Sequence, residues 1–246
     1  MYLLCTVFKP GLLIYIDIIV SVSNINVISL HLINNNSILQ IIWCFTDSGR
    51  DVYGIVGLVQ MDKDLLVYTD SRNHCLRKLE LHGVEENRTW LSSTFAGSCF
   101  EPGDVVGQKE IGRLRQPLEC KHYQGHIFVT DNLYKIKQIS VNGTITTIYK
   151  SLPKNKLMFL EMGNSANEFY VTTNYGVLHI KNGEESWLVQ SDSSMIFTEP
   201  DAIYFIEQKQ IVWLSNDTLL VADPPTHTLK KIDVMLNRTE KICTGM

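Results

Sequence analysis

Short apolar runs, each closed by a polar turn, recur along the chain. LLVYT, IFVT, FYVT and LLVA begin at Leu65, Ile127, Phe169 and Leu219, respectively. Continuous runs rich in β-branched and aromatic residues are typical of strands that are covered on both faces. No stretch keeps the 3.6-residue apolar period of a helix over about 11 positions or more. The pattern therefore predicts an all-β chain.

The residues that follow the first run return at the far end of the chain. LLVYTDSRNHCLRKLEL, residues 65–81, matches LLVADPPTHTLKKIDV, residues 219–234, with a gap of one residue in the apolar run. Asp70 thus aligns with Asp223. His74 aligns with His227 in the same way.

Two weaker copies lie between these two. IFVTDNLYKIKQISV, residues 127–141, contains Asp131, and FYVTTNYGVLHI, residues 169–180, has Thr173 in place of the aspartate. Successive equivalent positions are 61, 42 and 50 residues apart. Internal repeats of this length indicate propeller blades or solenoid arrays.

Each copy reads as a strand, a turn and a second strand, followed by a polar turn and a further β-rich run. The later turns read NGT at residues 142–144 and NGEES at residues 182–186. Each unit therefore supplies three or four antiparallel strands. Residues 41–246 divide into four such units, at approximately 41–97, 98–150, 151–190 and 191–246.

The order of these segments resembles the NHL-repeat β-propellers. Their blades commonly read LYVADTGNHRIRKI, then TLAG and a glycine-rich loop, then ARFNQP at the start of the next blade. This chain has LLVYTDSRNHCLRKL, then TWLSSTFAGSCFEPGDVVG, then IGRLRQP at residues 111–117. The resemblance implies a divergent, partial propeller of about four blades, fewer than a closed ring of this family usually has.

We interpret the repeated polar residues as structural. Asp70, Asp131 and Asp223 follow the same strand in their units, where a carboxylate can cap a turn by accepting backbone N–H groups. Catalytic groups are normally single rather than repeated. His74 and His227 fall under the same argument, so we expect no catalytic, cofactor-binding or metal-binding role for these positions.

Composition narrows the function further. The 246 residues include 22 basic and 26 acidic side chains, a formal net charge of −4. No basic stripe with interleaved aromatic residues is present to neutralise phosphates, so nucleic acid is not an expected partner. The standard local motifs of catalytic, phosphate-binding and calcium-binding sites are missing.

The resemblance and these absences together predict a non-catalytic binding module for a protein or glycan ligand, with no cofactor. The alternative, which the resemblance also allows, is a propeller hydrolase or lyase with a metal ion in its central channel. His122 and His126 are the only close pair of histidines outside the repeat positions. We interpret them as ordinary strand residues rather than metal ligands.

Glycosylation sequons indicate the secretory route. They occur at Asn35, Asn87, Asn142, Asn216 and Asn237, each with Ser or Thr two residues later and no proline between. Asn87, Asn142 and Asn237 fall in predicted polar turns, where a glycan could be carried without burial. These sites predict a glycoprotein that is secreted or lies on the extracellular face of a membrane.

The first 40 residues are an apolar leader that lies outside the repeats. Lys9 precedes an apolar run over residues 11–22 with the length of a signal-peptide core, although Asp17 interrupts it. We expect the segment to be a signal peptide, a membrane anchor or a spurious extension that does not belong to the repeat. Any contact with a membrane is expected only through this segment.

The cysteines do not by themselves fix the compartment. In a secreted chain a disulfide is expected among Cys75, Cys99 and Cys120, with a connectivity that spacing cannot set. In a cytosolic chain the same residues would be small buried hydrophobes.

Overall fold

The computed structural model describes most of the chain. For residues 5–9, 12–20, 26–34 and 37–44 it describes the backbone, and it describes residues 56–83, 89–190, 211–223 and 228–244 with most of their side chains. In this part of the chain the only helical segment is the 3₁₀ turn η1 (Ser71–Asn73). No helix among the described residues is long and apolar enough to cross a membrane. The prediction of an all-β chain is confirmed.

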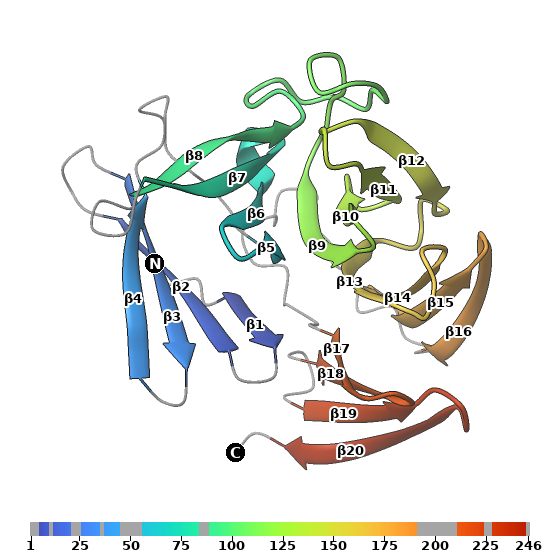
Figure 1. Cartoon of the computed structure of the whole chain (residues 1–246). Helices are drawn as coiled ribbons and strands as arrows, with labels where there is room; N and C mark the ends of the chain where they lie inside the picture. The colour runs from blue at the N-terminus through green and yellow to red at the C-terminus, as the bar shows by residue number, and fades with distance from the viewer. Residues whose placement is uncertain are drawn as a thin grey trace. The chain divides into compact units, whose positions relative to one another are not determined.

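The described strands form five antiparallel sheets of four strands, and in each sheet neighbours in sequence are neighbours in space (Figure 1). The first sheet comprises β1 (Cys5–Lys9), β2 (Leu12–Val20), β3 (Asn26–Asn34) and β4 (Ser37–Cys44). The second comprises β5 (Leu58–Asp62), β6 (Leu65–Asp70), β7 (Cys75–His82) and β8 (Thr89–Ala96).

The other three sheets repeat this meander. They comprise β9 (Pro117–Tyr123), β10 (His126–Asp131), β11 (Lys135–Ile139) and β12 (Ile145–Lys150); β13 (Leu157–Met162), β14 (Glu168–Thr173), β15 (Gly176–Lys181) and β16 (Glu184–Gln190); and β17 (Ile211–Ser215), β18 (Thr218–Asp223), β19 (Thr228–Asp233) and β20 (Arg238–Thr244). The apolar runs that reveal the repeat are β6, β10, β14 and β18, the second strand of each sheet.

Residues 5–44 form a sheet that the repeat does not reveal. β1 pairs with β2, β2 with β3 and β3 with β4, all antiparallel. The segment expected as an apolar leader thus contains paired strands, although its side chains lie outside the described residues. Its interpretation as a signal peptide, an anchor or an extension stays a prediction.

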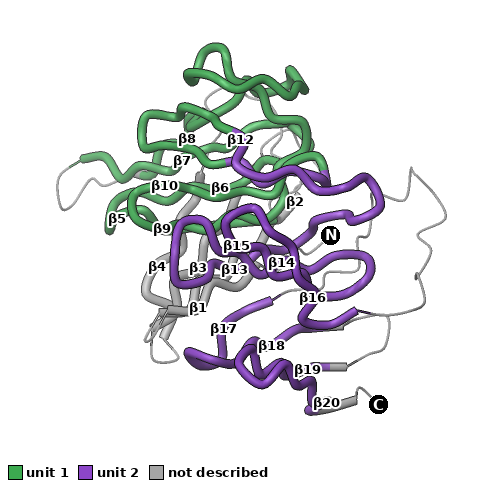
Figure 2. Tube along the Cα trace, turned by 90° about the vertical axis from the view of Figure 1, so that its right-hand side faces the viewer, with its two compact units in different colours: residues 1–132, 138–146 green, residues 133–137, 147–246 purple. Residues whose placement is uncertain are grey.

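The chain divides into two compact units (Figure 2). Unit 1 comprises residues 1–132 and 138–146, and unit 2 comprises residues 133–137 and 147–246. The main buried cluster of unit 1 joins the apolar residues of β5–β8 to those of β9–β12. Its members are Val59, Val67, Leu76, Phe95, Ala96, Leu114, Cys120, Ile127, Val129, Ile139 and Ile145.

A fully buried threonine on the second strand holds the first strand in three sheets. Thr69 Oγ1 accepts the N–H of Gly57 at 2.9 Å, Thr130 Oγ1 accepts the N–H of Glu119 at 3.2 Å, and Thr172 Oγ1 accepts the N–H of Phe159 at 3.1 Å. The fourth repeat has Ala222 at this position. The first two strands of these sheets are therefore fastened by side chain as well as by backbone hydrogen bonds.

Candidate functional site

Two of the repeated polar residues tie the same loop. The buried carboxylate of Asp131 accepts the backbone N–H groups of Arg115 and Gln116, at 3.0 and 2.8 Å. His74, in a left-handed conformation with φ of 63°, bonds through Nδ1 to the carbonyl oxygen of Arg115. The loop before β9 is thus held from both sides. Such contacts support a structural role for Asp131 and His74.

Asp70 makes a different set of contacts. Its Oδ2 accepts the guanidinium Nε of Arg77 and the amide nitrogen of Asn73, each at 2.9 Å. The side chains of Asp70 and Arg77 are only 0% and 3% exposed, so this is a buried ion pair. Asp70 makes no capping hydrogen bond to η1. At η1 the carboxylate of Asp70 thus bonds to the side chains of Asn73 and Arg77 in place of a turn cap, and the structural role of Asp70 in the repeat stays a prediction.

The third repeat lacks the aspartate, and two residues, Thr173 and Asn174, accept backbone N–H groups in its place. Thr173 Oγ1 accepts the N–H groups of Tyr175 and Gly176, at 3.0 and 3.2 Å, and so closes the turn. Asn174 Oδ1 accepts the N–H of Lys156 at 2.9 Å, and so holds the loop before β13.

The remaining positions predicted from the sequence are only partly described. Asp223 ends β18, but its side chain lies outside the described part of the structure. His227, Asn35 and Asn87 lie wholly outside it. Asn142, Asn216 and Asn237 lie in turns and are exposed. Their glycosylation stays a prediction.

The histidine pair does not form a site. His122 pairs with Ile127, and His126 pairs with Tyr123, so the two imidazoles point to opposite faces of the sheet. Within the described residues, no three His, Cys, Asp or Glu side chains come together in a way that could hold a metal ion.

Cys75 and Cys99 form a disulfide, and Cys120 is a buried free cysteine. The bond joins the start of β7 to the loop that follows β8. It closes a loop with a sequence separation of 24 residues.

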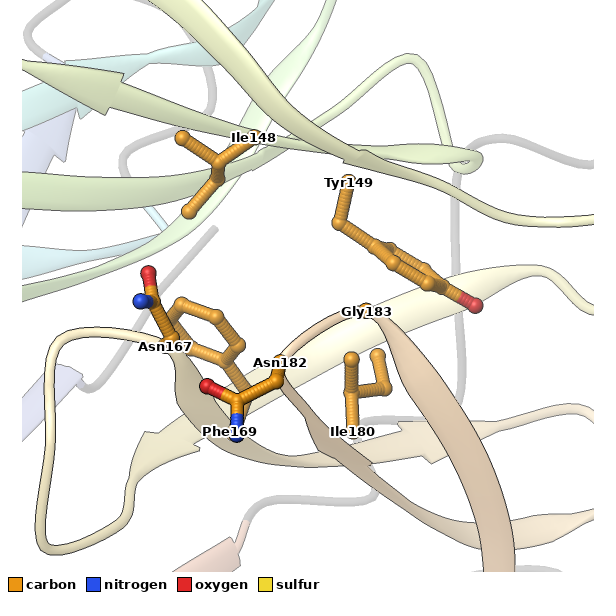
Figure 3. Close-up of a pocket in the computed structure, with 7 residues that line it drawn as sticks. All are labelled: Ile148, Tyr149, Asn167, Phe169, Ile180, Asn182 and Gly183. Carbon is orange, nitrogen blue, oxygen red and sulfur yellow. The ribbon is translucent and has the colours of Figure 1, made fainter.

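A pocket of about 260 Å³ in unit 2 is the best candidate for a binding site (Figure 3). Side chains from β12 lie on one side of it, and those of β14, β15 and the adjoining turns lie on the other. The lining residues are Ile148, Tyr149, Asn167, Phe169, Ile180, Asn182 and Gly183. None of them carries a charge at neutral pH.

The polar rim of this pocket is held by its turns. Asn182 and Gly183 have φ of 52° and 85°, the left-handed pair that a two-residue hairpin turn between β15 and β16 requires. The N–H of Asn182 donates to the carbonyl oxygen of Asn167 at 2.8 Å, which joins this turn to the one before β14. Both amide side chains are therefore carried on turns fixed to each other.

Tyr149 is held at the opposite wall. Its hydroxyl donates to the carboxylate of Glu185 on β16. Burial, reinforced by that carboxylate, raises the pKa of Tyr149 well above its ordinary value of 10.0. The phenol therefore stays neutral at physiological pH, and its ring is fixed against the pocket.

On the other face of β14, a polar cluster surrounds Glu168, whose side chain is 6% exposed. Glu168 Oε1 lies 3.0 Å from His179 Nε2 and 3.2 Å from Lys181 Nζ, and Oε2 accepts the N–H of Asn164 at 3.1 Å. Burial alone would raise the pKa of Glu168. The hydrogen bonds from His179, Lys181 and Asn164 outweigh it and hold that pKa below 4.5.

Aromatic rings cover this cluster. The ring of Tyr170 stacks on His179 with centroids 4.5 Å apart, and Trp213 of β17 meets Tyr170 edge-on at 5.1 Å. Burial and the charge of Glu168 raise the pKa of Tyr170 to about 12. Ser186 Oγ lies 3.5 Å from His179 Nδ1, beyond the roughly 2.6–3.2 Å at which a base takes up a proton. The geometry favours a stabilising role over catalysis.

Neither the pocket nor the cluster was predicted from the sequence. Most of their residues belong to the third repeat, in which the family-like motif is weakest, while β12 and β17 contribute from the repeats before and after it. The NG turn at residues 182–183 was a usable signal, because it fixes where β15 ends. The contribution of β12 depends on packing between sheets, which no local pattern encodes.

No protein-family model matches the chain, and no curated protein sequence matches it significantly. Solved structures do match. They include a proposed 6-phosphogluconolactonase from Bacteroides uniformis (10% identity, TM-score 0.56, 98% of this chain) and virginiamycin B lyase from Staphylococcus aureus (15%, 0.53, 98%). A protein of unknown function from Bacteroides thetaiotaomicron also matches (10%, 0.54, 97%).

These similarities show the fold alone. With the four-stranded antiparallel sheets, they confirm the prediction of a propeller-like fold. Membership of the NHL family stays a prediction. The chain spans 71%, 73% and 64% of the lengths of the three matching chains, so the activity of a whole protein of this shape reaches this chain only as a proposal.

Proposed function

We propose that the chain is a non-catalytic binding module of the propeller class, acting outside the cell. The pocket of Figure 3 carries this proposal, because it places two exposed amide side chains, on turns fixed to each other, over a hollow floored by Phe169 and Ile180. Binding sites are typically apolar hollows in which a few placed polar groups set the orientation of the ligand. At about 260 Å³ the pocket lies just below the roughly 300–1,000 Å³ of sites that enclose drug-sized molecules. It would hold one ring of a larger ligand.

The chemistry of the lining favours a neutral glycan. A charged ligand would lose its hydration without an opposite charge among the lining residues to replace it. The amides of Asn167 and Asn182 each donate and accept hydrogen bonds, as sugar hydroxyls require. Tyr149 and Phe169 lie beneath these amides and are only 8% and 2% exposed, so hydrogen bonds from the amides, rather than stacking on the rings, would hold a sugar.

Two observations support an extracellular location. The Cys75–Cys99 disulfide is of the kind that persists in oxidising compartments. The sequons at Asn142, Asn216 and Asn237 lie in exposed turns, where a glycan would not disturb the sheets.

Binding to printed arrays tests the ligand class. The chain, produced in a bacterial periplasm so that the disulfide forms without glycosylation, would be applied to a glycan array and to a peptide array. We expect binding to neutral glycans. Binding confined to peptides would replace the glycan with a protein ligand, and binding to neither would contradict the module.

A matched pair of variants tests whether the glycan binds at the pocket. Asn182→Gly removes the rim amide but keeps the left-handed turn, and should weaken glycan binding by about tenfold, the value of one good hydrogen bond. Asn237→Gly removes an exposed amide from another left-handed turn, with φ of 49°, and should leave binding unchanged. Equal effects of the two substitutions would exclude the pocket.

A further inference from the structure

A second hollow, of about 330 Å³, lies over the β11–β12 hairpin in unit 1. Gln138 and Ser140 alternate along one arm of the hairpin, and Thr144 and Thr146 along the other, so their side chains share one face. Ile139 and Ile145, which lie between them in sequence, are fully buried in the core. All six lining residues carry a polar group, but their carbon atoms form most of the surface of the hollow: His126, Gln138, Ser140, Asn142, Thr144 and Thr146.

One lining residue is the acceptor of a sequon. The side-chain oxygen of Asn142 accepts hydrogen bonds from the hydroxyls of Ser140 and Thr144, the latter at 3.1 Å. Because both hydroxyls hold the carbonyl end of this exposed amide, its nitrogen is turned away from them. That nitrogen is the atom to which an N-linked glycan is attached.

We propose that this hollow seats an N-linked glycan carried by Asn142, whose first sugar packs over the hairpin. On transfer from a lipid-linked oligosaccharide, a bond forms between Asn142 Nδ2 and the anomeric carbon of the sugar. The bond from that carbon to the lipid diphosphate breaks, and the diphosphate leaves with the proton of the amide. The attached N-acetylglucosamine then packs on the carbon atoms of Gln138 and Thr146. It exchanges hydrogen bonds with the amide of Gln138 and donates to the Thr146 hydroxyl, whose own hydrogen is held by the backbone carbonyl oxygen of Gln138 at 3.2 Å.

The sequon at Asn237 provides the contrast. It lies in the β19–β20 turn beside Met235 and Leu236, which are 80% and 64% exposed and offer a sugar no hydrogen bonds from their side chains. A glycan at Asn237 extends into solvent, whereas a glycan at Asn142 lies on polar side chains. The inference rests on the extracellular location proposed above and is independent of the pocket of Figure 3.

The experiment compares the two sites in one molecule. The protein is secreted from a glycosylating eukaryotic host, and mass spectrometry of its peptides measures occupancy. A time course with peptide N-glycosidase on the folded protein then measures release at each site. We expect occupancy at both sites and release several-fold slower at Asn142 than at Asn237, with the difference abolished after denaturation. The double variant Gln138→Ala/Thr146→Ala keeps the sequon and should bring release at Asn142 to the rate at Asn237.

Stability gives an independent readout. Asn142→Gln should lower the melting temperature by about 2–4 °C more in the secreted, glycosylated protein than in the unglycosylated protein from a bacterial periplasm, which accounts for the lost bonds from Ser140 and Thr144. Asn237→Gly, which removes the other sequon but keeps its left-handed turn, should leave the melting temperature nearly unchanged. The proposed glycan seat is wrong if the glycan at Asn142 is released as fast as the glycan at Asn237. It is also wrong if Asn142 carries no glycan while Asn237 does. If neither site is occupied, the secretory location falls as well, while glycan binding at the pocket is still judged by the arrays.

Discussion

The sheets β9–β12 and β13–β16 fasten the loop before their first strand by different means. In the former a single buried carboxylate, Asp131, accepts the N–H groups of Arg115 and Gln116. In the latter the aspartate is absent, and the amide of Asn174 accepts the N–H of Lys156 while Thr173 closes its own turn. The same backbone groups are satisfied by different side chains. A repeat can therefore lose its sequence motif and keep its fold.

The comparison also separates stability from binding. The residues that repeat, Asp70, His74 and Asp131, are occupied by contacts inside unit 1. The pocket lies beside the repeat that matches least, and its rim residues Asn167 and Asn182 stand on turns. Repeated positions maintain the fold, and residues that do not repeat, from β12 and from β14, β15 and their turns, form the candidate site.

The largest effect is expected at Asp70. Asp70→Ala leaves the guanidinium of Arg77 buried without its partner and should destabilise the fold by about 3–5 kcal/mol, more than the loss of a turn cap. Thr173→Ala, at the equivalent position of the third repeat, should cost only about 1 kcal/mol. Urea unfolding measures both. If Asp70→Ala and Asp70→Ala/Arg77→Met were equally destabilised, the cost would not come from the unpaired charge.

The disulfide comes next. Replacing both Cys75 and Cys99 by alanine should lower the free energy of unfolding by roughly 3 kcal/mol, because the unfolded chain regains the freedom of a 24-residue loop. Thermal melts with and without a reductant supply the control. The reductant should lower the melting temperature of the wild type and leave that of the double variant unchanged, and an unaffected wild type would mean that the bond is not formed.

The loop ties provide a direct comparison of the two sheets. Asp131→Ala leaves two backbone N–H groups without their acceptor and should lower the free energy of unfolding by about 2–4 kcal/mol. Asn174→Ala leaves one such group and should lower it by about 1 kcal/mol. The measurement is again urea unfolding. A larger loss at Asn174 would show that the third sheet depends on this contact more than the hydrogen bonds indicate.

The smallest effect concerns Glu168 and pH. The pKa of Glu168 is lower in the folded state than its ordinary 4.5, so its contribution to stability is present above about pH 4.5 and is lost as pH falls through the lower value. Glu168→Gln should therefore be less stable than the wild type at neutral pH and converge with it in acid. Glu110→Gln, an exposed control, should parallel the wild type throughout. A constant gap between wild type and Glu168→Gln down to pH 2 would contradict the assigned direction.

Local pattern was sufficient to predict the all-β class and the apolar second strands, because buried strands and polar turns leave a direct signature in sequence. It was not sufficient for the partner of Asp70, since the sequence does not show that the side chain of Arg77 on β7 reaches Asp70 at the end of β6. The threonines at 69, 130 and 172 were visible as a repeat but read as strand residues, because their hydroxyl bonds depend on the neighbouring strand. The sheet of β1–β4 gave no signal, since residues 5–44 do not resemble the repeat.

The central claim is that repeated residues maintain the fold while the pocket of Figure 3 binds the ligand. Urea unfolding and binding to an array of neutral glycans, measured in parallel on Asp131→Ala and Asn182→Gly, test it most directly. We predict that Asp131→Ala unfolds at a lower urea concentration and keeps the binding pattern of the wild type, whereas Asn182→Gly unfolds with the wild type and binds about tenfold more weakly. An Asp131→Ala variant that unfolds with the wild type but no longer binds would make the repeated aspartate a site residue and contradict the account.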